Sequence, residues 1–514
     1  MNSLTIPPET RPANPIKRGP ALTLLASLLL SLLYSPPVAH LFPDEAVFRY
    51  AGMLIARGGV PYRDLFDHKP PLIYFMDCGA HVLGSWGYWI TDTLLVTGAT
   101  LFFYKRCREK QLPYPWILPL LFNLLIRDYM LGMGVGTTRA CTTIFLLIAF
   151  CLLSGRTQKP STRSYTFFWL GLLASATLLM QQDQLLTLLP FLAYAFIDQC
   201  PTLRIFLIRL AQAAAGFMVI AGPILLYFGI HHALGAFWQD AFMFNLTWYA
   251  DRRSLGEQFR AIHAALNLTE LGMLLLICST LAVTALLVHA RQKLLILASL
   301  AAAALSFTPE LISGRVVDYM GGFVYYYTPL AAVLPILAFT AWTATDHPFL
   351  RSRISHAVFG FLICAPMVYN AVRLAAHLSL HNERNITATA EYRFIDRQRP
   401  TDYQLYIFGN NHWTYVYNRL GILAPSPWIY HHFWQWYPGW DAGHHILASI
   451  GHDLLAHHTR YVVDFSGEMT FTDHGAYACW KSFLQKYYQL VPLPGSHDST
   501  VWQLRQDSTN IHEK

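Results

Sequence analysis

Long apolar runs with few charges recur through the first three quarters of the chain. An α-helix of roughly 20 apolar residues is long enough to cross a bilayer, and many of these runs approach that length. Charged residues make up 13% of the 514 residues, against roughly 25% in an ordinary soluble domain. So little charge does not cover a soluble surface of this size. The sequence therefore predicts a mainly α-helical, polytopic membrane protein in contact with the lipid bilayer.

The apolar runs predict about eleven transmembrane helices. The first run, 21–34, also resembles a signal peptide, but Pro36, Pro37 and His40 make a poor cleavage site, so we expect it to remain as the first helix. The further spans are expected at 87–104, 112–127, 138–154, 165–181, 184–199, 206–230, 268–289, 293–308, 322–342 and 354–376.

Basic residues fall on alternate connecting loops, from Lys17 near the N-terminus to Arg353 late in the chain. The positive-inside rule makes those loops cytoplasmic. An odd number of crossings then places the loops 40–86 and 231–267 on the outer side of the cytoplasmic (inner) membrane, together with the C-terminal end. The formal net charge of +7 is modest and lies mainly in short loops, so we expect no nucleic-acid partner.

Three parts follow from this topology: a cytoplasmic tail over 1–20, a transmembrane domain over 21–377 and a periplasmic or extracellular domain over 378–514. The last part never stays apolar long enough to span a bilayer. Strand-like and helical segments alternate in it, which predicts a small α/β fold. These segments lie near 403–408, 444–456, 461–465 and 476–487.

The C-terminal part also holds paired histidines, such as His431 and His432, and an aromatic cluster that includes Trp428 and Trp434. Adjacent histidines point apart, and a metal site needs three or four converging ligands, so we expect no metal here. The aromatic side chains would stack on sugar rings or rest at the membrane interface, and we favour the interface.

The first outer loop, 40–86, is too polar to span and too long for a turn. Apolar residues from Val47 to Ile55 recur at helical spacing, which predicts a helix lying on the membrane surface. After the breaker Gly58-Gly59-Val60-Pro61, a second short helix is expected to start at Pro70-Pro71, because proline suits a first helical turn. The sequence thus predicts two interfacial helices in this loop.

Asp44 and Glu45 stand just after Pro43, where the first of these helices begins. One interpretation is structural, since Asp is a good N-cap. The other is chemical: a carboxylate at the interface can act as general base and take the proton from an acceptor hydroxyl that attacks a sugar carbon.

Asp67-His68-Lys69 precedes Pro70-Pro71 and puts a cation beside a helix N-terminus, where the helix dipole disfavours positive charge. An anion would resolve that conflict. Lys69, His68 and the backbone amides therefore suit a phosphate at headgroup depth. The alternative is that Lys69 binds ordinary lipid headgroups.

Further polar residues lie at the outer ends of the expected spans, where a loop or snorkelling role is the common one. Together they give one outer face unusual polarity. They are Arg127, Asp128, Arg139, Gln181, Gln182, Asp183 and Arg315.

The stretch PDEAVFRYAGMLIARGGVPYRDLFDHKPPLIYF resembles the first external loop of bacterial GT-C glycosyltransferases related to protein O-mannosyltransferases and to the aminoarabinose transferase of lipid A. An acidic residue after the first span, a G-x-PYRD turn and a KPPL helix appear here in the order of that family. MQQDQLLTLLP, FNLTWYA, SGRVVDYMGGFVYYYTPL and YIFGNNHWTYVYNRLG extend the likeness more weakly.

The resemblance implies a GT-C fold and an inverting transfer of sugar from a polyprenyl-phosphate carrier to an acceptor outside the cytoplasmic membrane. It makes Asp44 the catalytic base, with Glu45 its neighbour, and Lys69 a contact to the carrier phosphate. We add His68 and Arg63 to the phosphate contacts. The substrate cavity is expected to include Asp128, Arg139, Gln182, Arg315 and Tyr326.

Three positions depart from the family pattern. The acidic residue at the entrance to the fourth span is replaced near Thr138 and Arg139, the lysine after the fifth span is Gln181, and a histidine of an HYY-like motif is Tyr325. These changes bear on the donor and on activity itself, whereas the first loop is undisturbed.

The sequence is therefore interpreted as a membrane glycosyltransferase whose acceptor is a glycolipid, a polysaccharide or a protein. A polysaccharide polymerase or ligase is an alternative of the same fold, and the loop 231–267 is the feature that favours it. A transporter and a non-catalytic polyprenyl-phosphate-binding scaffold are the others, although a transporter would be expected to carry charges near mid-span. The sugar, the acceptor and a need for a divalent cation are left open by the sequence.

Overall fold

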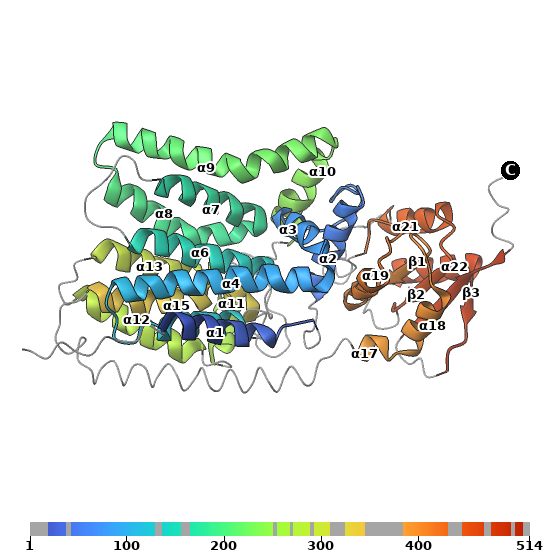
Figure 1. Cartoon of the computed structure of the whole chain (residues 1–514). Coiled ribbons are helices and arrows are strands. Elements are labelled where there is room, and N and C mark those ends of the chain that lie inside the picture. Colours follow the sequence, from blue (N-terminus) through green and yellow to red (C-terminus); the bar gives the residue numbers. More distant parts are fainter. Residues whose placement is uncertain are drawn as a thin grey trace, which may run out of the picture.

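A computed structural model describes residues 19–36, 43–128, 136–155, 165–249, 254–267, 271–287, 292–308, 324–344, 384–429, 445–466, 474–494 and 499–506. A bundle of roughly aligned helices forms one end of the molecule, and a smaller unit built around a sheet forms the other (Figure 1). Helices α2 (Pro43–Ala56) and α3 (Leu72–His81) lie where the two ends meet.

Each helix of the bundle overlaps one of the expected spans, and the last expected span, 354–376, lies outside the described residues. Among the residues that are described, α9 is the helix long and apolar enough by itself to cross a membrane, and the shorter apolar helices have 10–17 residues. The bundle consists of α1 (Gly19–Leu32), α4 (Gly84–Glu109), α5 (Ile117–Ile126), α6 (Thr138–Ser154), α7 (Thr166–Met180), α8 (Leu185–Gln199), α9 (Leu203–Ile230), α12 (Leu271–Leu287), α13 (Lys293–Leu305) and α15 (Leu330–Ala344).

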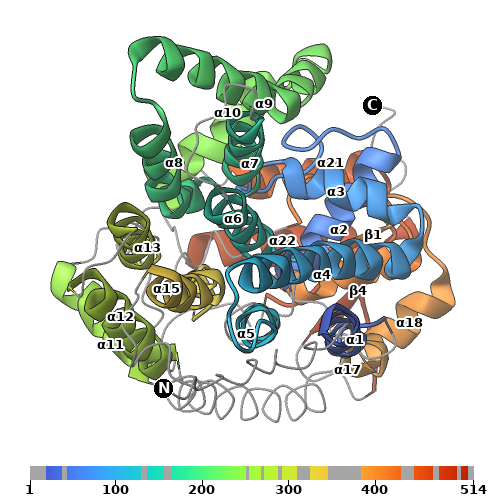
Figure 2. The ribbon, with the colours of Figure 1, turned by 60° about the vertical axis from the view of Figure 1, so that its left-hand side comes forward.

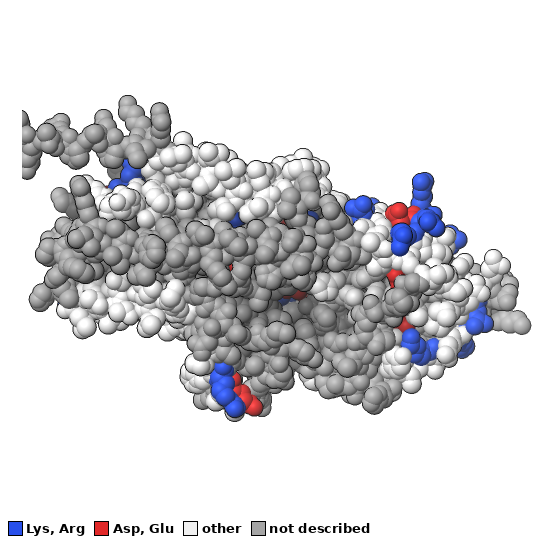
Figure 3. Space-filling view, turned by 90° about the horizontal axis from the view of Figure 1, so that it is seen from below, with Lys and Arg blue, Asp and Glu red and all other residues white. Residues whose placement is uncertain are grey.

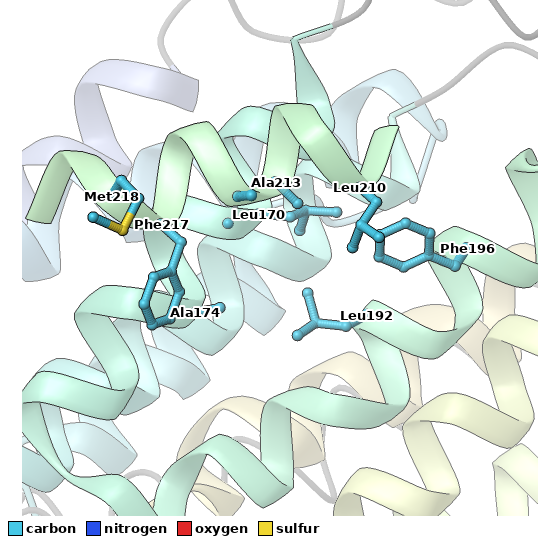
Figure 4. A pocket seen from close by; sticks show the side chains of 10 residues that line it. Leu170, Ala174, Leu192, Phe196, Leu210, Ala213, Phe217 and Met218 are labelled. Carbon is cyan, nitrogen blue, oxygen red and sulfur yellow. The ribbon is translucent and has the colours of Figure 1, made fainter. Parts of the chain in front are cut away.

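Helices α7 and α9 approach each other at two glycines. A Cβ at Gly171 would lie 1.9 Å from the Ala213 carbonyl oxygen, and one at Gly216 would lie 1.9 Å from the Phe168 carbonyl oxygen. Small residues allow this contact between apolar helices, as is common in membrane proteins. Beside it, α7, α8 and α9 line an open apolar pocket of about 300 Å³, with apolar side chains such as Phe217 (Figure 4).

Figure 2 shows α9 and α10 (Leu234–Trp238) on the side of the bundle opposite to α1, with α2 and α3 at its end. After α10 the chain forms wide helical turns over Gln239–Met243 and Asn245–Tyr249, followed by α11 (Leu255–Asn267). In the view from below, most described charged atoms lie over the end that carries the sheet (Figure 3). This distribution suits a bundle surrounded by lipid.

Helix α2 corrects one prediction. Its apolar stripe was expected to face the membrane surface, yet Val47, Tyr50, Ala51 and Leu54 are each 5% exposed or less. The stripe packs against α3 and against α19 (Thr414–Leu420) of the C-terminal unit. The helix itself was predicted correctly, because an apolar periodicity indicates only that one helix face is buried. That face is buried against protein here and not against lipid.

The C-terminal unit contains a four-stranded sheet in the order β1-β2-β4-β3. β1 (Leu405–Phe408) and β2 (Tyr461–Asp464) are parallel, with Leu405 opposite Tyr461, while β4 (Thr500–Leu504) is antiparallel to both β2 and β3 (Tyr488–Val491). The described helices of the unit are α17 (Arg384–Thr387), α18 (Ala390–Gln398), α19, α21 (His445–Ala456) and α22 (His474–Tyr487). The strands and helices expected here are confirmed.

Hydrogen bonds tie this unit to the first loop, the described segment 43–81 between α1 and α4. Asn418 Nδ2 donates to the Ala46 carbonyl at 2.8 Å, and the Phe66 N–H donates to the Pro427 carbonyl at 2.9 Å. The Ala424 N–H donates to the Tyr50 hydroxyl at 2.9 Å. The C-terminal unit therefore holds α2 and the start of the Asp67-His68-Lys69 turn in place.

Candidate functional site

The two acidic residues at the start of α2 belong to different charge clusters. Glu45 is 9% exposed and accepts a 2.5 Å hydrogen bond from Arg49, one turn further along the helix. The Arg49 guanidinium lies 4.4 Å above the Tyr88 ring. Glu45 also contacts Gly136, where φ is +89° in the left-handed region and a Cβ would lie 3.0 Å from the Glu45 carboxylate. Glu45 is thus enclosed by protein and held by a cation.

Asp44 instead interacts electrostatically with Asp67, in the Asp67-His68-Lys69 turn. Burial raises the pKa of Asp67 to about 6, and the negative charge of Asp44 adds to that shift. Asp67 is 2% exposed and accepts hydrogen bonds of 2.7 Å from the Tyr74 hydroxyl and from the His68 N–H. Asp44 and Asp67 therefore lie close enough to interact electrostatically.

Lys69 is 6% exposed, which is unusual for a lysine. Its positive charge lowers the pKa of Asp67 and that of Asp183, so its amine lies within electrostatic reach of both carboxylates. Within the described ranges the amine takes part in no ion pair. A sheltered ammonium group with no ion pair among the described residues is well suited to bind a phosphate.

Asp183 joins a second cation to this group. Its carboxylate lies 3.0 Å from Arg139 Nη1 and accepts a 2.6 Å hydrogen bond from Gln181 Nε2. Arg139 is 4% exposed and stacks 4.4 Å from the Tyr326 ring. Burial opposes ionisation of Asp183, yet Arg139 and these hydrogen bonds leave its pKa lowered. Two departures from the family pattern, Arg139 and Gln181, thus meet at one carboxylate.

The sequence singled out Asp183 as a polar span end but did not place it in the site. Its signal was the MQQDQ run directly after an expected span. That run folds into a short turn, Gln182–Gln184, between α7 and α8, and Gln182 Nε2 donates to the Ala241 carbonyl at 3.1 Å.

The loop after α10 supplies two residues that the sequence did not assign. Asn245 Nδ2 donates to the His68 carbonyl at 2.7 Å, which fixes the turn from the other side. Burial raises the pKa of Asp240 to about 7, and Asp67 adds to the shift. The FNLTWYA stretch around Asn245 was the available signal.

The remaining candidate residues are placed differently. The Arg63 side chain is half exposed, and its guanidinium donates two 2.8 Å hydrogen bonds to the Asp64 carboxylate. These bonds use the pair of N–H groups that would otherwise bind a phosphate. The His68 ring lies 6.0 Å from the Phe244 ring, and its Nδ1 is 3.8 Å from Asp67. Asp128 is 8% exposed at the end of α5. Arg315 lies outside the described residues.

In the part of the chain that the structure describes, no three His, Cys, Asp or Glu side chains gather where they would hold a metal.

Comparisons with known proteins identify the fold. No family model and no curated protein sequence matches the chain. A structure of ArnT from Cupriavidus metallidurans bound to undecaprenyl phosphate matches with a TM-score of 0.62 at 13% identity, over 96% of this chain and 99% of that one. The same protein in the apo state matches with a TM-score of 0.59 at 13% identity, over 95% and 98%.

An archaeal oligosaccharyltransferase, AglB from Archaeoglobus fulgidus in complex with an inhibitory peptide and a dolichol-phosphate, matches with a TM-score of 0.43 at 13% identity, over 96% and 75%. The ArnT match extends over nearly the whole length of both chains, so it covers the bundle, the first loop and the C-terminal unit together. The chain therefore shares the fold of ArnT.

Proposed function

We propose that the protein is an inverting glycosyltransferase that moves a sugar from a polyprenyl-phosphate carrier to an acceptor on the outer side of the cytoplasmic membrane. The observation that supports the proposal is that Asp44 and Lys69 both lie within electrostatic reach of Asp67, with Lys69 buried and outside any ion pair of the described residues. The match to ArnT bound to undecaprenyl phosphate supports the same class of carrier.

The arrangement suits the chemistry. Asp44 takes the proton of the acceptor hydroxyl as its oxygen attacks the anomeric carbon from the face opposite the phosphate. The bond from that carbon to the phosphate oxygen breaks, and its electron pair stays on the oxygen. Lys69 offsets the charge that develops on the phosphate, which needs positive charge more than a proton donor.

The position of the cluster also fits the carrier. A polyprenyl chain does not leave the bilayer, so its phosphate is presented where headgroups meet water. Asp44 is at the start of α2 and Lys69 shortly precedes α3. These two helices lie where the bundle meets the C-terminal unit (Figure 1). The acceptor is then a glycolipid, a surface polysaccharide or a protein that approaches from the side of the C-terminal unit.

Replacing Asp44 by Asn tests the proposal. The purified protein in lipid vesicles is given an undecaprenyl-phosphate sugar and acceptors of the three classes, and the release of undecaprenyl phosphate is measured. Loss of a general base lowers a rate by about 10²–10⁴-fold, so we expect Asp44→Asn to lose at least about 100-fold. Turnover that is unchanged in this variant would rule out Asp44 as the base.

Glu45→Gln provides the matched comparison, because the same charge is lost one residue away. We expect the transfer rate per folded molecule to change by less than about threefold, since Glu45 faces Arg49. A large loss of rate in Glu45→Gln, with little loss in Asp44→Asn, would identify Glu45 as the general base. Carrier binding without release by the unaltered protein would favour the scaffold.

A further inference from the structure

The backbone carbonyl of Lys69 is held by two tyrosine hydroxyls. Tyr62 donates to it at 2.6 Å and Tyr74 at 3.1 Å. The single Tyr74 proton is shared with the closer Asp67 carboxylate at 2.7 Å, so Tyr62 is the main donor to the Lys69 carbonyl. We call Tyr62 and Tyr74 the carbonyl clamp.

The two prolines after Lys69 explain why side chains make this contact. Pro70 and Pro71 have no N–H to donate, and the first helical N–H groups of α3, at Tyr74 and Phe75, bond to the Pro71 carbonyl. The Lys69 carbonyl therefore lies just outside the helix, in a buried place where an unsatisfied acceptor is unfavourable. The clamp supplies its donors.

Tyr62 adopts a strained backbone in order to reach that carbonyl. Its φ is +67°, in the left-handed region that favours glycine. The residue is 6% exposed, and its ring packs 5.5 Å from Phe228 and 5.6 Å from Phe237, which belong to α9 and α10. Packing from these two elements thus maintains a conformation that a tyrosine rarely adopts, and such strain is concentrated at functional sites.

The hydroxyl stays a donor under ordinary conditions, because burial raises the pKa of Tyr62 well above its usual value. From the opposite side, Asn245 holds the neighbouring His68 carbonyl at 2.7 Å. The backbone of the turn is therefore fixed by side chains from different elements. The Lys69 side chain that leaves it has no ion pair among the described residues.

We propose that Tyr62 is a positioning residue for Lys69, and that its hydroxyl sets the affinity of the site for the phosphate of the carrier. This inference rests on the proposed function. A lysine side chain loses much rotamer freedom when it is immobilised. Fixing its backbone in advance reduces what phosphate binding must order, which raises affinity without a contact to the ligand.

A purely structural role predicts something different. If Tyr62 only satisfies a buried carbonyl, its loss affects folding in the same way as the loss of any similar tyrosine. Tyr406 is a matched control: it is fully buried in the C-terminal unit, and its hydroxyl donates to the Trp428 carbonyl at the same 2.6 Å. The two substitutions to Phe remove the same group from the same kind of bond.

The test measures binding of undecaprenyl phosphate, without sugar, to the full-length protein in nanodiscs of uncharged lipid. We expect Tyr62→Phe to raise the dissociation constant at least about fivefold and Tyr406→Phe to change it less than about twofold. Combining Tyr62→Phe with Lys69→Gln is expected to weaken binding no further than Lys69→Gln alone, because the tyrosine acts through the lysine.

Equal effects of Tyr62→Phe and Tyr406→Phe, or full additivity with Lys69→Gln, would overturn the inference while leaving the proposed function intact. Equal binding by the unaltered protein and by Lys69→Gln would instead remove the phosphate role of Lys69, and the inference with it. If Tyr62→Phe does not fold, Tyr74→Phe replaces it. Its affinity for undecaprenyl phosphate should fall at least about twofold, a smaller effect because the Tyr74 hydroxyl is 3.1 Å from the carbonyl and shares its proton with Asp67.

Discussion

Asp44 and Glu45 are neighbours in sequence, yet they belong to two regions with different charge arrangements. We call the surroundings of Glu45 and Arg49 the closed region, and those of Asp44, Asp67 and Lys69 the open region. In the closed region, Glu45 and Arg49 form a 2.5 Å ion pair. In the open region, the Asp67 carboxylate interacts electrostatically with both Asp44 and Lys69, and Lys69 has no ion pair within the described residues. Charges that satisfy one another stabilise a fold, whereas a sheltered charge left accessible is available to a ligand.

The closed region continues into the bundle through Arg127. This residue is fully buried, lies 3.6 Å from Asp92 and donates to the Ser31 hydroxyl at 2.7 Å. Its Nε donates to Asn123, which in turn donates to the Ser27 hydroxyl at 2.8 Å. Helices α1, α4 and α5 are thus joined by polar groups, while α7 and α9 are joined by close contact of small residues.

The largest expected effect is on stability in the closed region. Arg127→Gln removes the cation from the Asp92 carboxylate, whose side chain is 13% exposed, and the loss of such a mostly sheltered pair costs about 3–5 kcal/mol of unfolding free energy. Thermal unfolding in detergent measures it, and adding Asp92→Asn should recover part of the loss. An unfolding temperature that stays unchanged in the single variant would show that the region is not held by this pair.

The open region should show a pH effect of opposite sign to that of a stabilising carboxylate. Burial raises the pKa of Asp67 from 3.8 to about 6, so the folded state holds this proton more tightly than the unfolded state. Between these pH values unfolding releases a proton, and stability falls as the pH rises towards about 6. The contribution is on the order of 2–3 kcal/mol.

The comparison of Asp67→Asn with the unaltered protein isolates this contribution. The fall in unfolding temperature between pH 4 and pH 7 should be smaller in the variant. If the unfolding temperature depends on pH identically in the two proteins, ionisation of Asp67 does not destabilise the folded state.

Lys69→Gln should reverse the pattern seen for Arg127. Loss of a charge-assisted bond to phosphate is worth about 1.5–3 kcal/mol, or roughly 10–100-fold in the affinity for undecaprenyl phosphate. Stability should change little, because the amine supports no ion pair among the described residues. Lys69→Arg is the control that keeps the charge. If Lys69→Gln lowers stability without lowering the affinity, Lys69 has a structural role like that of Arg127.

The smallest effect concerns Asp183, whose charge lies between Arg139 and Lys69. Asp183→Asn makes the surroundings of the carrier phosphate more positive, so the donor should bind more tightly and the product should leave more slowly. We expect KM and kcat both to fall by about threefold to tenfold. A rise in KM would show instead that the carboxylate is needed to hold the site together.

The sequence predicted most of the helices because local periodicity determines them. The expected span 138–154 coincides with α6, and the segment 184–199 differs from α8 by one residue. The turn before α3 was also predicted, because Pro70 and Pro71 restrict the backbone there. The count of about eleven spans remains a prediction, since the segment 354–376 lies outside the described residues.

The parts that the sequence did not predict depend on contacts between distant residues. Nothing near Asp183 indicates that it meets Arg139, which lies 44 positions earlier in the chain. The cover over α2 is supplied by α19, and the strained Tyr62 is held by α9 and α10. Such pairings follow from how the helices pack and have no local pattern.

An experimental structure with undecaprenyl phosphate bound tests the central claim most directly. The account predicts a phosphate oxygen about 2.7–3.2 Å from the Lys69 amine, with the Asp44 carboxylate opening onto the same space. A phosphate bound away from both residues, or the two side chains facing separate pockets, would contradict the account.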